Sequence, residues 1–163
     1  DPEMSRGLGD VYKRQTAECA VEIALSYLPM TLRQCPVLVI GWGRIGKCLG
    51  QILHALDADL TVAARKDADR AMCRGLGYAA VDTARMAETL GKYRLILNTA
   101  PEMLLTREQL AQCHPDCVKI DLASRTGMEG DSVIVARGLP GVHMPESSGR
   151  LIAETYVRLC REE

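Results

Sequence analysis

Three glycines at fixed spacing are the residues of this sequence best suited to bind a ligand. Residues 41–46 read GWGRIG, the pattern G-x-G-x-x-G, directly after an apolar run. In that pattern the first glycine makes a tight turn, the second lets the backbone approach a pyrophosphate, and the third lets a helix pack closely on a strand. Amides at the start of the following helix then bind the diphosphate. We therefore predict a dinucleotide site made by Gly41, Trp42, Gly43, Arg44, Ile45 and Gly46.

The residues that follow the second apolar run select between two dinucleotides. Proteins that bind NAD place an acidic side chain there, on the ribose hydroxyls. This chain instead reads Ala64-Arg65-Lys66, with two cations and no carboxylate. Because a guanidinium suits a 2′-phosphate, we predict NADP as the cofactor. Asp67 and Asp69 follow closely and leave NAD open as the alternative.

Polar residues also follow the later apolar runs. Ligands of open parallel sheets bind at the carboxyl ends of the strands. Residues there can hydrogen-bond the nicotinamide ribose or carboxamide, and a proline can hold the turn. We predict that the cofactor site includes Asn98, Thr99, Ala100, Pro101 and Asp121.

Candidate substrate-binding residues lie further along the chain. Ser124 and Arg125 offer a hydroxyl and a cation. Ser147 or Ser148 is expected to cap the last helix, whose first amides make a second anion site suited to a carboxylate. His143 lies between a glycine turn at residues 138–141 and that helix, so it is a weak candidate for acid/base catalysis. The other catalytic residues stay unknown.

Apolar runs and helical patterns alternate along the chain, and this alternation is what must position the site. Strands are expected at residues 36–40, 60–63, 78–81, 95–97, 117–120 and 132–135. Helices are expected from Thr16 to a stop at Pro29, over residues 45–56, from about residue 67, over 83–90, after a Thr106–Gln109 capping box, and over 151–159. The order predicts an α/β fold: a doubly wound parallel sheet, Rossmann-like, with a flanking N-terminal helix.

The first fifteen residues differ from the rest. Residues 1–15 (DPEMSRGLGDVYKRQ) show no apolar periodicity and no signal-peptide core. They look like translated adapter sequence, so we expect a non-native tail followed by one dinucleotide-binding domain over residues 16–163. On that expectation the natural chain is longer at its N-terminus.

Composition excludes several classes of protein. The 163 residues carry a net charge of -1, which gives no electrostatic footprint for nucleic acid or a membrane surface. The apolar runs are too short to span a membrane. The seven scattered cysteines are typical of reduced thiols in a cytoplasmic protein. Cys113 and Cys117 lack a second ligand pair, so no metal site is expected.

Several short strings together resemble the family of the dipicolinate synthase A subunit, over nearly everything from Thr16 onward. They are TAE at residues 16–18, VLVIGWGRIG at 37–46, ARK at 64–66, NTAP at 98–101, DLAS at 121–124, LPG at 139–141 and SG at 148–149. The glycine loop alone is shared with other dehydrogenases. The combination of all these strings is what narrows the resemblance to this family.

The resemblance implies an oxidoreductase of sporulating bacteria that oxidises dihydrodipicolinate to dipicolinate and passes the hydride to NADP. It also implies a partner, the flavoprotein-like B subunit of dipicolinate synthase. The substrate would be a small dicarboxylate, with Arg125 and the helix start near Ser148 as its partners. Because the N-terminal domain of that family is missing here, we expect this piece to bind cofactor and to turn over little or no substrate.

Other functions stay open. The same elements would serve a cofactor domain like that of alanine dehydrogenase or of hydroxyacid dehydrogenases. A non-catalytic module that senses NAD(P) is the alternative outside the enzymes. If residues 121–125 and 139–149 line the cleft beside the nicotinamide, the enzyme is favoured over the sensor.

Overall fold

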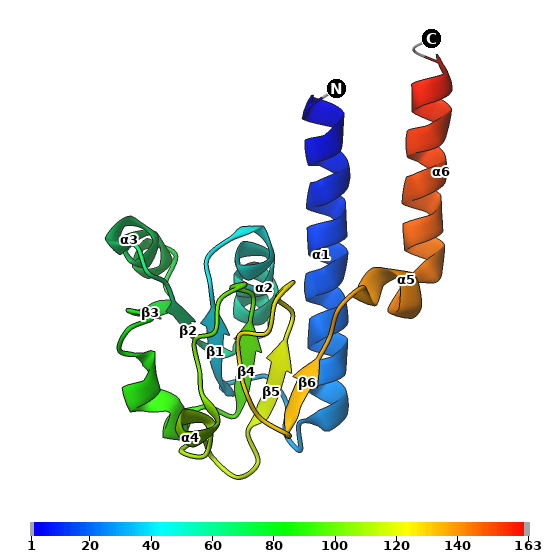
Figure 1. Ribbon diagram of the computed structural model, residues 1–163. Coiled ribbons are helices and arrows are strands. Elements are labelled where there is room, and N and C mark those ends of the chain that lie inside the picture. The colour runs from blue at the N-terminus through cyan, green and yellow to red at the C-terminus, as the bar shows by residue number, and fades with distance from the viewer. Residues whose placement is uncertain (1, 162–163) are drawn as a thin grey trace.

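Six parallel strands form one sheet in the order β3-β2-β1-β4-β5-β6 (Figure 1). The structure is a computed structural model that describes the backbone of residues 2–161 and the side chains of residues 9–150, 152–154 and 157. The strands are β1 (Pro36–Ile40), β2 (Asp59–Ala63), β3 (Ala79–Val81), β4 (Leu95–Asn98), β5 (Val118–Asp121) and β6 (Val133–Val135). The order reverses between β1 and β4, where ligands of such sheets bind.

Helices cover both faces of the sheet. They are α1 (Pro2–Tyr27), α2 (Arg44–Ala55), α3 (Asp67–Gly75), the 3-10 helix η1 (Met86–Lys92), α4 (Arg107–Leu110), α5 (Leu139–His143) and α6 (Pro145–Arg161). Helices α1 and α2 pack side by side on one face, and η1 and α4 cover the other. The doubly wound Rossmann-like fold predicted from the sequence is confirmed.

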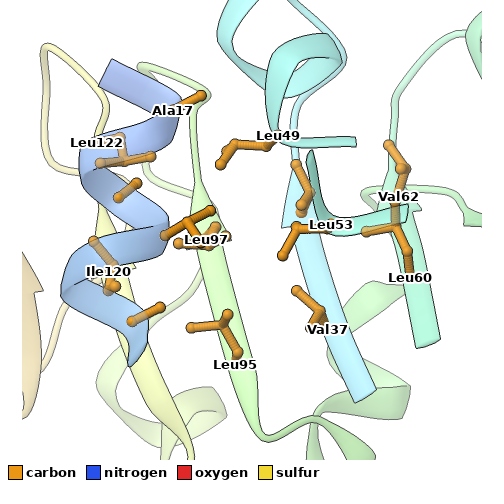
Figure 2. Close-up of a cluster of buried hydrophobic side chains, with 14 of the residues drawn as sticks. Ala17, Val37, Leu49, Leu53, Leu60, Val62, Leu95, Leu97, Ile120 and Leu122 are labelled. Carbon is orange, nitrogen blue, oxygen red and sulfur yellow. The ribbon is translucent and has the colours of Figure 1, made fainter. Parts of the chain in front are cut away.

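Alternation along each strand builds the two halves of the core. Val37 and Val39 of β1 join the cluster under α1 and α2, while Leu38 and Ile40 join the cluster under η1 and α4. Figure 2 shows the first cluster, with Leu49 and Leu53 of α2 above the strands. Strands of a parallel sheet are continuous apolar runs, because both faces of the sheet are buried. Such runs can be identified in the sequence alone.

Several local expectations differ from the structure. Helix α1 begins at Pro2 and not at Thr16, so residues 2–15 of the expected tail form the first part of this helix. Asp1 lies outside the described residues. Whether that segment is native stays a prediction. The helix expected over 83–90 is a 3-10 helix at Met86–Lys92, and the glycine turn at 138–141 is the start of α5, which follows Gly138 at φ 65°.

No helix connects β5 to β6 in the described chain. Residues 122–132 connect these two strands without a helix. Within this loop, Met128 makes a parallel bridge with Leu105. Both side chains are buried in the cluster under η1 and α4. The loop therefore fills the place of a crossover helix.

Helix α6 continues beyond α5 and extends alongside α1 (Figure 1). On this helix, which was expected over residues 151–159, Ile152 is 67% exposed, and the side chains of residues 151, 155, 156 and 158–161 lie outside the described residues. Within the part of the chain that was described, no helix is long and apolar enough to cross a membrane.

Candidate functional site

The glycine loop leaves the carboxyl end of β1 through a conformation that only glycine adopts easily. Gly41 has φ 98°, in the left-handed region. A Cβ at Gly41 would lie 2.5 Å from Oγ1 of Thr99. The Thr99 hydroxyl is held there by a 2.8 Å hydrogen bond to the carbonyl of Ile40. The turn after β1 and the end of β4 are therefore packed directly on each other.

The other two glycines of the loop differ in their surroundings. A Cβ at Gly43 would meet no atom within 4 Å, so the backbone there faces open space. A Cβ at Gly46 would overlap the carbonyl oxygen of Gly41. The second glycine thus leaves room for a ligand, and the third lets α2 approach β1, as the sequence predicted.

The start of α2 is open to an anion. Its N-cap residue, Gly43, has no side chain to accept from the first amides, and no acidic residue lies in the first turn. Arg44 points away toward α1, where its guanidinium lies 3.3 Å from a carboxylate oxygen of Asp10. The free amides and the positive end of the helix dipole fit the diphosphate of a dinucleotide.

A cavity of about 390 Å³ lies on the β2 side of this loop. Arg65 and Lys66 line it directly after β2, and the Arg65 guanidinium lies 3.6 Å from a carboxylate oxygen of Glu102 across the cavity. Both partners are exposed, so this ion pair is weak and Arg65 is available to a ligand. The full lining is Gly41, Trp42, Gly43, Ala63, Ala64, Arg65, Lys66, Asp69, Thr83, Thr99, Ala100, Pro101, Glu102 and Leu104.

Asp67 and Asp69, which kept NAD as the alternative cofactor in the sequence analysis, differ in their surroundings. Asp67 forms an ion pair with Arg70 of the same helix. Asp69 lines the cavity beside Arg65. The structure therefore places two cations, Arg65 and Lys66, and two carboxylates, Asp69 and Glu102, around this cavity.

A second cavity of about 480 Å³ lies on the other side of residues 99–101, where β4, β5 and β6 end. It shares Thr99 and Pro101 with the first cavity, so the two flank one turn. Its remaining lining is Tyr12, Lys13, Thr16, Ile45, Leu122, Ala123, Ser124, Ala136, Arg137 and Gly138. The two cavities therefore offer space on both sides of the turn at residues 99–101.

The cations that line the second cavity, Lys13 and Arg137, differ from the one predicted. Ser124 lines the cavity as expected, but Arg125 is exposed and does not. Arg137 lines it instead, with Nε donating to the carbonyl of Ala123 at 2.9 Å. Arg137 lies two residues after the end of β6, so the rule of strand ends was the signal that could have found it.

Asn98 and Asp121 form a buried network and do not line either cavity. Both side chains are fully buried, and Nδ2 of Asn98 donates to Oδ1 of Asp121 at 2.9 Å. The same carboxylate accepts from the amides of Ala123, Gly127 and Met128 at 3.1, 2.8 and 3.3 Å. Asn98 also bonds both the amide and the carbonyl of Ala100. These two residues therefore shape the loops beside the site and leave no atom free for a ligand.

Trp42 contributes to the site through its place in the loop. Its ring is buried in the core, with its centroid 5.9 Å from that of Tyr78 in an edge-to-face arrangement. Gly50 on α2 leaves room for the ring, because a Cβ there would lie 3.0 Å from it. The tryptophan is thus a fluorescent reporter next to the glycine loop.

The expected caps of the last helix are wrong. Helix α6 begins at Pro145, so Ser147 and Ser148 lie within its first turn. The Ser148 hydroxyl donates to the carbonyl of Pro140 at 3.0 Å, and its amide donates to the carbonyl of Met144. That amide is not free for an anion, and neither serine lines the two cavities.

His143 lies in a different place from the glycine loop. Its Nδ1 is 3.6 Å from a carboxylate oxygen of Glu22 on α1. It lines a third cavity, between α1, β6 and α5. Its catalytic role stays a prediction that the geometry does not support.

Cys113 and Cys117 lie close together on the face of the sheet that η1 and α4 cover. The neighbouring Cys117 thiol lowers the pKa of Cys113 to about 7, while Cys113 raises the pKa of Cys117. Burial raises the pKa of Cys35 and Cys73. Among the described residues there is no group of three or more metal ligands.

We predict that the thiol of Cys113 is the reactive one of this pair. The alkylation rate of Cys113 by iodoacetamide should rise with pH around a midpoint of about 7, because the thiolate is the nucleophile. Cys117→Ala should move that midpoint upward, since it removes the neighbouring thiol that lowers the pKa of Cys113. Peptide mass spectrometry after brief alkylation measures both, with Cys48, whose pKa burial raises, as the control. A midpoint that Cys117→Ala leaves unchanged would contradict the assignment.

Comparison with known proteins finds a curated relative and solved structures of similar fold. The chain matches no protein-family model. It is 29% identical over 155 residues to the dipicolinate synthase A subunit of Bacillus subtilis (strain 168). The matched region covers 90% of this chain and 52% of the relative. The chain thus spans about half the length of the curated relative it matches.

Solved structures share the fold. The crystal structure of the dipicolinate synthase A subunit from Bacillus halodurans superposes with a TM-score of 0.84 at 26% identity, over 94% of this chain and 55% of that one. A transhydrogenase from Sinorhizobium meliloti superposes with a TM-score of 0.80 at 21% identity, over 94% and 55%. The transhydrogenase shows a shared fold only. The resemblance to the dipicolinate synthase A subunit that the sequence motifs indicated is confirmed.

Proposed function

We propose that this chain is the NADP-binding part of an oxidoreductase that converts dihydrodipicolinate to dipicolinate. The observation that carries the cofactor preference is Arg65, which follows β2 and lines the cavity at the ribose end of the glycine loop. A guanidinium there favours a 2′-phosphate over two ribose hydroxyls. The reaction itself is proposed from the similarity to the A subunit of dipicolinate synthase.

The residues of this chain hold the cofactor and shape the space for the substrate. The amides at the start of α2 bind the diphosphate, and Gly43 leaves the space for it. The nicotinamide supplies the hydride acceptor when it is bound. Aromatisation of the ring favours the oxidation, so positioning the ring is the main task of the protein.

The second cavity suits such a substrate. Leu122, Ala123 and Ala136 give it apolar walls, and Arg137 and Ser124 give it a cation and a hydroxyl. A flat ring that carries carboxylates matches both features. We further propose that the B subunit of dipicolinate synthase is the partner, and that turnover needs more than the half of the relatives that this chain spans.

Nucleotide titration tests the proposed cofactor. Following Trp42 fluorescence, NADPH should bind more tightly than NADH, and Arg65→Ala should remove that preference. The expected weakening of NADPH binding is more than about tenfold, because hydrogen bonds to charged groups contribute roughly 1.5–3 kcal/mol. Arg33→Ala is the control, since Arg33 is exposed and pairs with Asp57 away from the site.

Two results would contradict the proposal. One is that neither nucleotide binds, which removes the cofactor site altogether. The other is tighter binding of NADH, with Arg65→Ala leaving the ratio unchanged. In that case Asp69, the carboxylate in the same cavity, becomes the residue that binds the ribose.

A further inference from the structure

Arg70 connects three segments behind the ribose end of the nucleotide cavity. It lies on α3, and its guanidinium donates to the carbonyls of Ala64 at 2.6 Å and Arg65 at 2.7 Å. It also forms ion pairs with Asp67 at the start of α3 and with Asp82 after β3, the latter at 3.2 Å. One side chain thus joins the end of β2, the start of α3 and the end of β3.

The burial of Arg70 shows that these contacts are fixed. The side chain is 12% exposed, whereas those of Asp67 and Asp82 are 93% and 38% exposed. A mostly buried guanidinium needs acceptors on most of its N–H groups. Here two main-chain carbonyls and two carboxylates supply them, so other conformations of the side chain would lose these bonds.

Arg70 does not itself line the cavity beside the glycine loop. That cavity is lined by Ala64, Arg65 and Lys66, and Arg70 contacts this segment from the opposite side. Its bonds to the carbonyls of Ala64 and Arg65 hold the backbone on which the Arg65 side chain is carried.

We propose that Arg70 is a positioning residue for nucleotide specificity, which acts by holding the Ala64–Arg65 backbone so that Arg65 meets the 2′-phosphate. This inference rests on the proposed function, because it requires the cavity to bind NADP. Arg70 needs no contact with the nucleotide in this role. Its effect passes entirely through Arg65.

A double-mutant cycle tests the inference. The ratio of the dissociation constants of NADH and NADPH is measured for wild type, Arg70→Gln, Arg65→Ala and the double variant. Arg70→Gln should lower the ratio at least fivefold while the NADH constant changes less than twofold. In the Arg65→Ala background, Arg70→Gln should leave the ratio unchanged, since residues that act as one unit are not additive.

Two further variants separate positioning from folding. Arg74→Gln is the matched control on the same helix, where Arg74 is exposed, and it should keep the wild-type ratio. Asp82→Asn removes one anchor of Arg70 and should lower the ratio by less than Arg70→Gln does. Circular dichroism of each variant confirms the fold, and Asp82→Asn carries the test if Arg70→Gln does not fold.

The outcomes distinguish this inference from the proposed function. If Arg65→Ala removes the preference but Arg70→Gln and Asp82→Asn keep it, the positioning role is overturned and the proposed function stands. If Arg70→Gln lowers the ratio equally in both backgrounds, Arg70 acts directly on the nucleotide and the inference is also overturned. A wild-type chain with no preference for NADPH overturns both.

Discussion

Replacing Gly46 with alanine should weaken NADPH binding more than about tenfold, or 1.4 kcal/mol. The new methyl group would overlap the carbonyl oxygen of Gly41, a backbone atom that cannot rotate away. Helix α2 must then move from β1 and take the diphosphate-binding amides with it. Overpacking of this kind typically lowers the free energy of unfolding by about 1–3 kcal/mol. Trp42 fluorescence with NADPH and with urea measures both effects.

Gly43→Ala is the informative comparison. A Cβ there meets no protein atom within 4 Å, so stability should fall by no more than about 1 kcal/mol, the cost of alanine at an N-cap. NADPH binding should still weaken, because the methyl group occupies the space for the diphosphate. Gly149→Ala on α6, also in open space, should leave NADPH binding unchanged and raise stability by about 0.5–1 kcal/mol, because alanine favours a helix interior more than glycine does. If Gly46→Ala binds NADPH like wild type, the glycine loop is not the nucleotide site.

Replacing Asp121 with alanine should lower the free energy of unfolding by about 3–5 kcal/mol, because each buried donor that loses its acceptor costs about 1–3 kcal/mol. The carboxylate is fully buried and accepts four hydrogen bonds, from Asn98 and from the amides of Ala123, Gly127 and Met128. Alanine leaves all four donors without an acceptor. Chemical denaturation followed by circular dichroism measures the change.

Asp131→Ala is the matched control for that experiment. Asp131 pairs with Arg107, which lowers the pKa of the carboxyl, but its side chain is 88% exposed. Removal of an exposed ion pair should cost no more than about 1 kcal/mol. If Asp121→Ala is as mild as Asp131→Ala, the buried network does not hold the loops beside the site.

The amino-acid sequence by itself determined the fold and the glycine loop. Apolar runs and helical spacing are local patterns, and the sheet they build is confirmed with the expected order of elements. The roles of Gly41, Gly43 and Gly46 were equally readable, since each follows from one missing side chain at a fixed position. The Thr106–Gln109 capping box is present for the same reason, because its partners are three residues apart.

Only the tertiary structure decided which polar side chains face the cavities. Asp121 stands at a strand end, where a ligand-binding residue is expected, yet it meets Asn98 of the neighbouring strand and is buried. Arg137 lines the second cavity, while Arg125 in the predicted position does not. Arg70 reaches the carbonyls of Ala64 and Arg65, contacts that no spacing rule describes. A side chain takes the partners that folding brings to it from distant segments, and those partners are set by packing between elements, which residue type and spacing alone do not encode.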